Sequence, residues 1–265
     1  MPDAAFIAAL PKTELHLHLV GSASVDTVLE LARRRPQDEV PTDRGELERF
    51  YEFRDFAHFV EVYRAVDRLL RGPEDIVTLV AGAARDAAAA NARWVELTVT
   101  ATTHLWAGIG ATELAEALEA GRERARADHG VGVGFIFDID GEFGARAADN
   151  TLVFLRDHAP EGSLAIGLAG RELGVDRAQF AEHVAAARAL GYRAAIHAGE
   201  YTGPESIAAA LDALRADRIG HGIRAVEDRA LLARLVREQL PLEVCVTSNL
   251  RTRSAPSLEE HPCAS

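Results

Sequence analysis

Four histidines and one glutamate are the residues of this chain best suited to chemistry. His16 and His18 lie two residues apart in the apolar run KTELHLHLVG, while His197 and His221 end the later apolar runs RAAIHAG and RIGHGI. Glu200 follows His197 by three residues. Alternate side chains of a strand share a face, so His16 and His18 point the same way. Burying several imidazoles beside a carboxylate is costly unless a metal or a reaction uses them.

The histidines together predict a metal centre. Neutral imidazoles suit Zn²⁺ or another first-row metal, and three histidine ligands with one open position are the layout of a catalytic zinc. Such a metal lowers the pKa of its bound water to about 7 and supplies hydroxide at neutral pH. Glu200 would then move a proton, and a further histidine would hold the water. A single histidine at a strand end is more often structural, so this prediction depends on the conjunction.

The segments that must position these residues alternate between β-rich runs and helical stretches. We expect strands at 13–19, 94–99, 133–139, 164–170, 193–199, 218–223 and 242–248, and helices over 74–91, 113–128, 176–190, 204–215 and 227–238. This alternation predicts parallel strands joined by crossovers, as in a barrel or a doubly wound sheet. The first strand is followed by no GxGxxG or GxxxxGK[ST], which weakens the nucleotide-binding alternatives. In a barrel, the four histidines would meet at the C-terminal rim.

Residues 43–70 form a helical insertion between the first two strands. Phe53, Phe56, Phe59 and Tyr63 recur there at steps of three or four residues. Two interpretations remain open: a helix face packed on the core, or an apolar lid over the mouth of a pocket. We expect residues 1–265 to form a single catalytic barrel domain that contains this insertion.

Composition excludes several classes of protein. The 265 residues carry 29 Lys and Arg against 41 Asp and Glu, and the net charge of −12 argues against nucleic acid or an anionic membrane as a partner. Two cysteines without CxxC spacing suit a reducing compartment and exclude a disulfide-built domain. Since we find no signal peptide and no apolar run of about 18 residues, we expect a cytoplasmic protein.

Four segments carry a resemblance to a known family. TELHLHLVGS, AIHAGE, RIGHGI and VTSN, in this order and spacing, resemble the adenosine deaminase family of metal-dependent enzymes across nearly all of residues 10–262. The resemblance implies a distorted, TIM-like (β/α)₈ barrel of the metal-dependent hydrolase type. It also implies hydrolytic replacement of the 6-amino group of a small purine nucleoside. The cytidine-type zinc deaminases use a PCxxC segment instead, which is absent here.

The same resemblance assigns roles to individual residues. It implies one Zn²⁺ per chain, held by His16, His18 and His197. Glu200 would donate a proton to the purine ring, and His221 would orient the attacking hydroxide. Gly170, in the segment GLAGRE, would contact the purine through its backbone.

Val20 departs from the adenosine-specific pattern. Members that prefer adenosine have an acid at this position, which accepts a hydrogen bond from the ribose 5′-hydroxyl, and valine cannot accept one. HLHLVGS resembles instead the branch that deaminates aminodeoxyfutalosine for menaquinone biosynthesis, whose substrate carries a bulky aryl-keto acid at the 5′ carbon. Arg171 or Arg253 would meet that carboxylate, unless both are solvated surface charges. The alternative is an adenosine deaminase in which Val20 only retunes the pocket.

The end of the sequence is a second departure. The family continues past HP into an eighth strand with paired aspartates, of which the first completes the metal site and the second bonds the purine. This sequence ends at HPCAS and contains no SDDP or TDDP. We therefore expect the barrel of this chain to lack its eighth strand and helix, with open edges on the first and seventh strands. An inactive, truncated metal-binding remnant is thus a third functional alternative.

Overall fold

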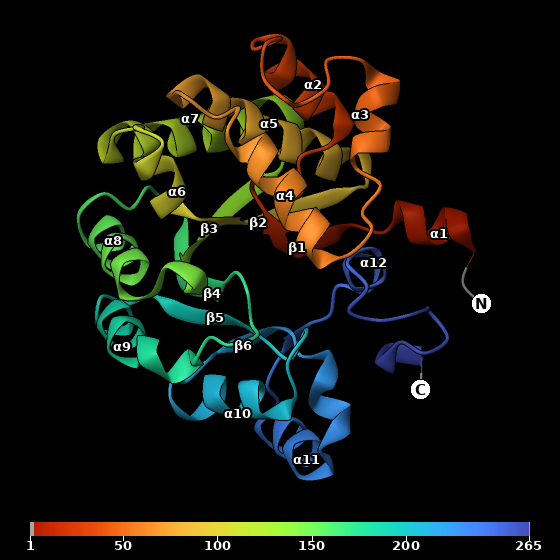
Figure 1. Cartoon of the computed structure of the whole chain (residues 1–265), viewed down its shortest axis with the longest axis vertical. Coiled ribbons are helices and arrows are strands. Elements are labelled where there is room, and N and C mark those ends of the chain that lie inside the picture. The colour runs from red at the N-terminus through yellow and green to blue at the C-terminus, as the bar shows by residue number, and fades with distance from the viewer. Residues whose placement is uncertain (1–2, 265) are drawn as a thin grey trace.

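A single parallel sheet organises the chain. The computed structural model describes residues 3–264, and its 7-stranded sheet follows chain order, each strand pairing in parallel with the next (Figure 1). The strands are β1 (Lys12–His18), β2 (Ala92–Val99), β3 (Gly132–Asp140), β4 (Ser163–Ala169), β5 (Arg193–Ala198), β6 (Arg218–His221) and β7 (Leu242–Glu243). Because all strands run the same way, their C-terminal ends share one rim.

The sheet curls until its first and last strands approach each other. β1 and β7 share no ladder, yet His16 Nδ1 of β1 lies 2.7 Å from Glu243 Oε2 of β7. Gly220 of β6 allows this closure, since a Cβ at that position would lie 2.9 Å from His16 Cε1. The result is a nearly closed barrel, which is one of the two arrangements that the alternation of strands and helices left open and the one that the resemblance to the adenosine deaminase family implies.

Helices cover the outside of the barrel, where β2 to β6 are largely buried. They are α1 (Ala4–Ala9), α2 (Val25–Arg33), α3 (Arg44–Phe50), α4 (Phe56–Asp67), α5 (Pro73–Ala89), α6 (Ala101–Trp106), α7 (Ala111–His129), α8 (Gly144–Asp157), α9 (Ala181–Ala189), α10 (Pro204–Asp212), α11 (Arg229–Glu238) and α12 (Val246–Arg251). Short 3₁₀ turns occupy Gly141–Phe143, Arg177–Phe180, Ile223–Glu227 and Pro262–Ala264.

Packing between the helices and the sheet leaves little free space. Phe135 and Phe137 of β3 are fully buried, and the ring centroid of Phe137 lies 5.0 Å from that of Phe154 of α8. Gly121 of α7 lies against Val80 of α5, where a Cβ would approach Val80 Cβ to 2.6 Å. Such close packing resists displacement of the strands and so holds the rim residues in place.

Two predicted elements differ from those observed. The expected strand over 242–248 is wrong in extent, because β7 ends at Glu243 and α12 begins at Val246. β7 pairs only with β6, at Ile219↔Leu242 and Gly220↔Glu243, and its other side meets no strand within residues 3–264. The expected helix over 176–190 is split into a 3₁₀ turn, Arg177–Phe180, and α9.

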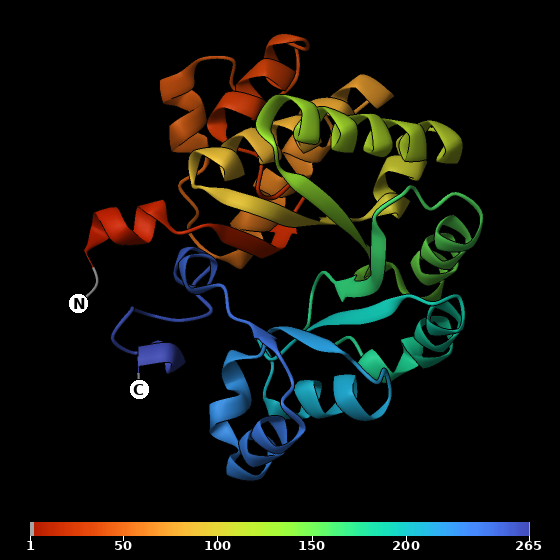
Figure 2. The same cartoon turned by 180° about the vertical axis from the view of Figure 1, so that it is seen from behind.

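The last part of the described chain lies beside its beginning. Figures 1 and 2, which view the molecule from opposite sides, both place α12 and the C-terminal segment next to α1 and β1. This is the side on which β1 and β7 remain unpaired with each other. Over residues 3–264, none of the helices combines the length and the apolar character that crossing a membrane requires.

Candidate metal and substrate site

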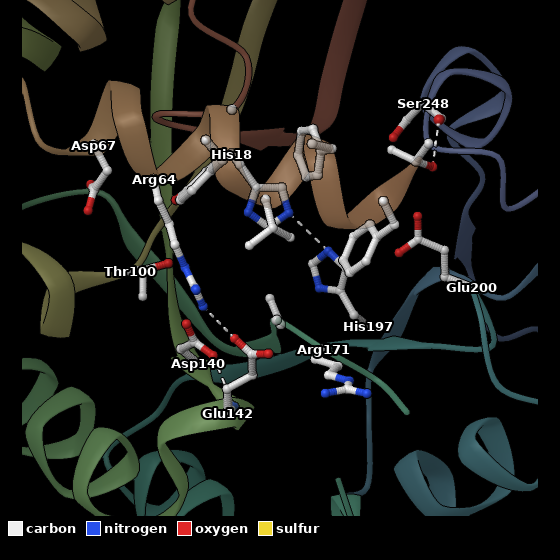
Figure 3. A pocket seen from close by; sticks show the side chains of 18 of the residues that line it. His18, Arg64, Asp67, Thr100, Asp140, Glu142, Arg171, His197, Glu200 and Ser248 are labelled. Atoms are coloured by element: carbon white, nitrogen blue, oxygen red, sulfur yellow. Dashed lines mark hydrogen bonds and ion pairs between the residues drawn. The ribbon is translucent and has the colours of Figure 1, made fainter. Parts of the chain in front are cut away.

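Three of the four histidines converge at the rim of the barrel. His16 and His18 come from β1 and His197 from β5, and each offers a ring nitrogen within 4.8 Å of the others. His18 Nε2 and His197 Nε2 face each other at 3.0 Å, as Figure 3 shows. Strand alternation brings both β1 histidines to the interior, and the curvature of the sheet brings β5 opposite β1.

Burial keeps the imidazoles of His18 and His197 neutral. It lowers the pKa of His18 to about 3 and that of His197 well below its ordinary value, and the neighbouring His16 lowers both further. A neutral imidazole has one nitrogen lone pair to offer a metal. The donor set and its spacing therefore fit a divalent first-row cation held by three histidines.

Glu243 orients the first of these ligands. Its Oε2 lies 2.7 Å from His16 Nδ1, so Nδ1 carries the proton and Nε2 is left to bind a metal. The other carboxylate oxygen, Oε1, forms an ion pair at 2.8 Å with Nε of Arg218, whose Nη2 donates to Glu96 Oε2 at 2.6 Å. Sequence reasoning missed this chain of charges. The available signal was an acid in the apolar run LEVCV.

We expect Glu243→Gln to weaken zinc binding by about 10–100-fold, the usual effect of losing a carboxylate that orients a metal-bound histidine. Competition with a chromogenic chelator measures the affinity. Glu14→Gln is the matched control, since Glu14 is exposed on the same strand as His16. An unchanged affinity in Glu243→Gln would remove Glu243 from the metal site.

His221 and Glu200 lie together beside the three histidines. The two side chains approach to 3.5 Å between His221 Nε2 and Glu200 Oε2. Asn249 Nδ2 donates to His221 Nδ1 at 3.0 Å, which places the proton of the neutral ring on Nε2, facing Glu200. The backbone of His221 is left-handed, with φ 62°. Non-glycine residues in this conformation cost stability and cluster at functional sites.

The charge state of Glu200 suits an acid. Burial, and then the negative charge of Glu172, raise the pKa of Glu200 to about 8. Burial and the neighbouring His16 and His18 lower the pKa of His221 well below its ordinary value. At pH 7 the pair is therefore a protonated carboxyl group beside a neutral imidazole.

Asn249 and His261 support His221 and were not predicted to act in the site. His261 Nε2 lies 3.2 Å from Asn249 Oδ1, to which it donates, and Asn249 Nδ2 also donates to Ser254 Oγ at 3.0 Å. All three side chains are buried. The segment VTSN marks Asn249 in the sequence, but only the fold brings α12 to His221.

A cavity of about 470 Å³ opens above this cluster, within the usual range for small-molecule sites. Gly170 and Arg171 line it together with the histidines and Glu200. Gly170 has φ 79°, and a Cβ there would lie 2.5 Å from Asp140 Oδ1, so this position requires glycine. Val20 is buried in the apolar core, with 4% of its surface exposed, and does not belong to the lining.

The aromatic residues of the insertion face the cavity, which favours the lid interpretation. Phe56, Phe59 and Tyr63 of α4 line it, and the Phe56 ring lies 4.5 Å from that of Tyr201, between centroids, on the loop after β5. Phe53 packs against Phe59 with centroids 5.2 Å apart. The opposite face of α4 packs on the core through Val62, Ala65 and Val66.

An ion pair joins the lid to the end of β3. Arg64 Nη2 of α4 donates to Glu142 Oε2 at 2.8 Å, and both residues line the cavity. Figure 3 shows this pair on the opposite side of His18 and His197 from Glu200. The cavity thus has a reacting end at Glu200 and a distal end closed by a partly exposed ion pair.

Comparison with known proteins shows the family of this chain. The sequence model described as adenosine deaminase matches residues 11–265. The chain belongs to the adenosine deaminase family. It is 46% identical over 259 residues to the aminodeoxyfutalosine deaminase of Streptomyces avermitilis, covering 97% of this chain and 72% of that protein. The adenine deaminase of Streptomyces coelicolor is 35% identical over 267 residues, covering 96% of this chain and 74% of its own length.

Solved structures of the family agree with the fold. An adenine deaminase from Arthrobacter aurescens superposes with a TM-score of 0.89 at 32% identity, covering 96% of this chain and 78% of that one. An amidohydrolase from Burkholderia ambifaria with bound zinc superposes with a TM-score of 0.87 at 31% identity, covering 98% and 72%. The predicted family and barrel are confirmed, and this adenosine deaminase family member is an enzyme of the hydrolytic purine deaminase type.

Proposed function

We propose that this protein is a zinc-dependent deaminase whose substrate is aminodeoxyfutalosine, an adenosine-type nucleoside with a large 5′ substituent used in menaquinone biosynthesis. The relatives named aminodeoxyfutalosine deaminase are 46% and 45% identical to this chain, against 35% for the adenine deaminase of Streptomyces coelicolor. The observation that carries the proposal is position 20. Valine has no acceptor for a ribose 5′-hydroxyl, and Val20 lies in the core directly before Gly21 and Ser22 of the cavity lining.

The residues of the chain divide the reaction between them. His16, His18 and His197 would hold zinc, which lowers the pKa of a coordinated water to about 7 and so supplies the nucleophile. Glu200, protonated at neutral pH, donates its proton to the ring nitrogen and makes C6 electrophilic. The oxygen of water then bonds to C6, and the bond from C6 to the amino nitrogen breaks. One proton of the water leaves with the amino group as ammonia, and the other restores the proton that Glu200 gave to the ring.

The remaining groups position the reactants. His221 presents its Nε2 next to Glu200 and orients the attacking water. Gly170 leaves its backbone open to the purine ring, because no side chain stands between them. The aromatic face of α4 excludes water, which strengthens the electrostatic interactions inside the cavity.

Arg171 is our candidate for the carboxylate of the substrate. It lines the cavity and forms no ion pair with the residues that the structure describes. Arg64, at the distal end, is already paired with Glu142. Arg253 lies outside the cavity lining, which leaves Arg171 the better placed of the two arginines.

Turnover of competing substrates tests the proposal. We would measure kcat/KM for aminodeoxyfutalosine, adenosine and adenine with zinc-loaded protein. The assay would also use a chimera in which residues 1–265 are joined to the part of the Streptomyces avermitilis relative that lies C-terminal to the matched region. A higher kcat/KM for adenosine or adenine would replace the proposal with that activity. Zinc binding without turnover in the chain, and in the chimera, would support a metal-binding remnant.

We expect Val20→Asp to shift the ratio of kcat/KM values toward adenosine by about 10–150-fold, the effect of one added hydrogen bond to a charged acceptor. A carboxylate is costly to leave in the apolar core, and the neighbouring Gly21 and Ser22 line the cavity, so we expect the new side chain to turn toward the substrate. Because position 20 is buried, zinc content and circular dichroism must first show that the variant folds. Val20→Thr is the matched control, since it changes the shape of valine little and adds no carboxylate. An unchanged ratio in folded Val20→Asp would separate residue 20 from specificity.

A further inference from the structure

Glu172 holds the loop that carries Glu200. We propose that Glu172 is a positioning residue, whose carboxylate fixes the backbone of residues 199–202 and places a negative charge at the backbone of Glu200. This inference rests on the proposed role of Glu200 as the acid. Glu172 stands two residues after Gly170 in GLAGRE, on the loop after β4, and only 5% of its surface is exposed.

The carboxylate of Glu172 accepts hydrogen bonds from the backbone N–H groups of all four residues 199–202. Its Oε2 accepts from the backbone N–H groups of Tyr201 at 2.7 Å and of Glu200 and Thr202 at 3.1 Å each. Its Oε1 accepts from Ser206 Oγ at 2.8 Å and from Gly199 N–H. Four consecutive amides directed at one side chain leave the loop few alternative conformations.

These bonds also keep Glu172 ionised. Burial works to raise its pKa, but the hydrogen bonds from Tyr201, Thr202 and Ser206 outweigh burial, so the pKa of Glu172 lies below its ordinary value. A carboxylate that accepts several N–H bonds favours its charged form. Glu172 therefore places a negative charge at the backbone of Glu200.

Several titratable and charged groups act on Glu200. They are Glu172, Arg177, Tyr201, His221 and Cys245. Arg177 works against Glu172: it is 2% exposed, and its guanidinium makes no hydrogen bond to the described residues. After burial, the charge of Glu172 is the largest influence on Glu200, which explains why an acid so near a buried arginine keeps its proton.

Glu172→Gln separates charge from packing. Glutamine keeps the size of the side chain and still offers Oε1 to residues 200–202, whereas its amide can donate to Ser206 Oγ. The N–H of Gly199 loses Glu172 as an acceptor but keeps its other partner, Ser206 Oγ, at 2.8 Å. We expect the titration midpoint of the Glu200 carboxyl group to fall by about 1 pH unit or more. Glu172→Asp keeps the charge but loses reach, so its midpoint should stay closer to that of the parent protein.

Carbon-13 NMR of the glutamate side-chain carboxyl groups measures this midpoint without any turnover. The Glu200 resonance is identified by its absence in Glu200→Gln, and zinc-free and zinc-loaded protein are titrated in parallel. Ser206→Ala is the control: it removes a partner of Glu172 without removing charge, and should leave the midpoint in place. An unchanged midpoint in Glu172→Gln would overturn the proposal, whether or not the protein deaminates any purine.

Arg177→Met provides a second test of the same proposal in case Glu172→Gln does not fold. Removing the positive charge leaves Glu172 unopposed, so the midpoint of Glu200 should rise. A fall would contradict the charge balance described here. In the chimera, the alkaline limb of kcat/KM should follow the same midpoints, moving to lower pH in Glu172→Gln. A purely structural role would lower the rate and leave that limb in place.

Discussion

Replacing Glu200 with glutamine is expected to lower kcat by about 10²–10⁴-fold, the usual contribution of a general acid, with no loss of zinc. Glutamine resembles the protonated carboxyl group in size and hydrogen bonding but has no acidic proton to give. Since the pKa of Glu200 is raised to about 8, the native side chain is itself protonated at pH 7. The substitution should therefore leave the fold and the metal site unchanged.

The role of Glu200 as the acid also predicts how turnover depends on pH. The reaction needs Glu200 with its proton, so turnover should decline as pH rises through the pKa of Glu200, and Glu200→Gln should lose this limb. We would measure kcat in the zinc-loaded chimera across pH 6–9, with Glu205→Gln as the control because Glu205 is exposed at the start of α10. Loss of zinc from Glu200→Gln would show that Glu200 is a metal ligand. Full activity would exclude it as the acid.

Removing one metal ligand should abolish stoichiometric zinc. His16 and His18 share a strand, and His197 completes the set from across the barrel, with ligand atoms within 4.8 Å of one another. His16→Ala or His197→Ala leaves two imidazoles, too few for the three-histidine site described above. We expect zinc to drop from about one ion per chain to a small fraction in either variant.

Elemental analysis of protein dialysed against a weak chelator measures this loss, without any need for turnover. His129→Ala is the control, since His129 ends α7 at the N-terminal side of β3, away from the rim. Unchanged zinc in both His16→Ala and His197→Ala would mean that the metal binds elsewhere. Zinc lost from one variant alone would require a different ligand set.

The sequence by itself determined the barrel and the identity of its rim residues. Strand periodicity is two, so HLH alone places His16 and His18 on one face, and the alternation of apolar runs with amphipathic helices specifies parallel strands whose C-terminal ends meet. Local patterns of this kind need no knowledge of distant contacts. The order of four short segments then sufficed to indicate the family.

Only the tertiary structure decided which residues support that site. Glu243 meets His16 across 227 positions of sequence, Asn249 meets His221 across 28, and Glu172 meets Thr202 across 30. Closure of the barrel creates each contact, and an isolated glutamate or asparagine carries no periodic signal that reveals its partner. The choice between a lid and a core-packed helix face likewise depended on which face of α4 packs on the core, and the sequence did not show this. Val20 shows the same limit, because the fold buries a side chain whose type alone suggested a pocket wall.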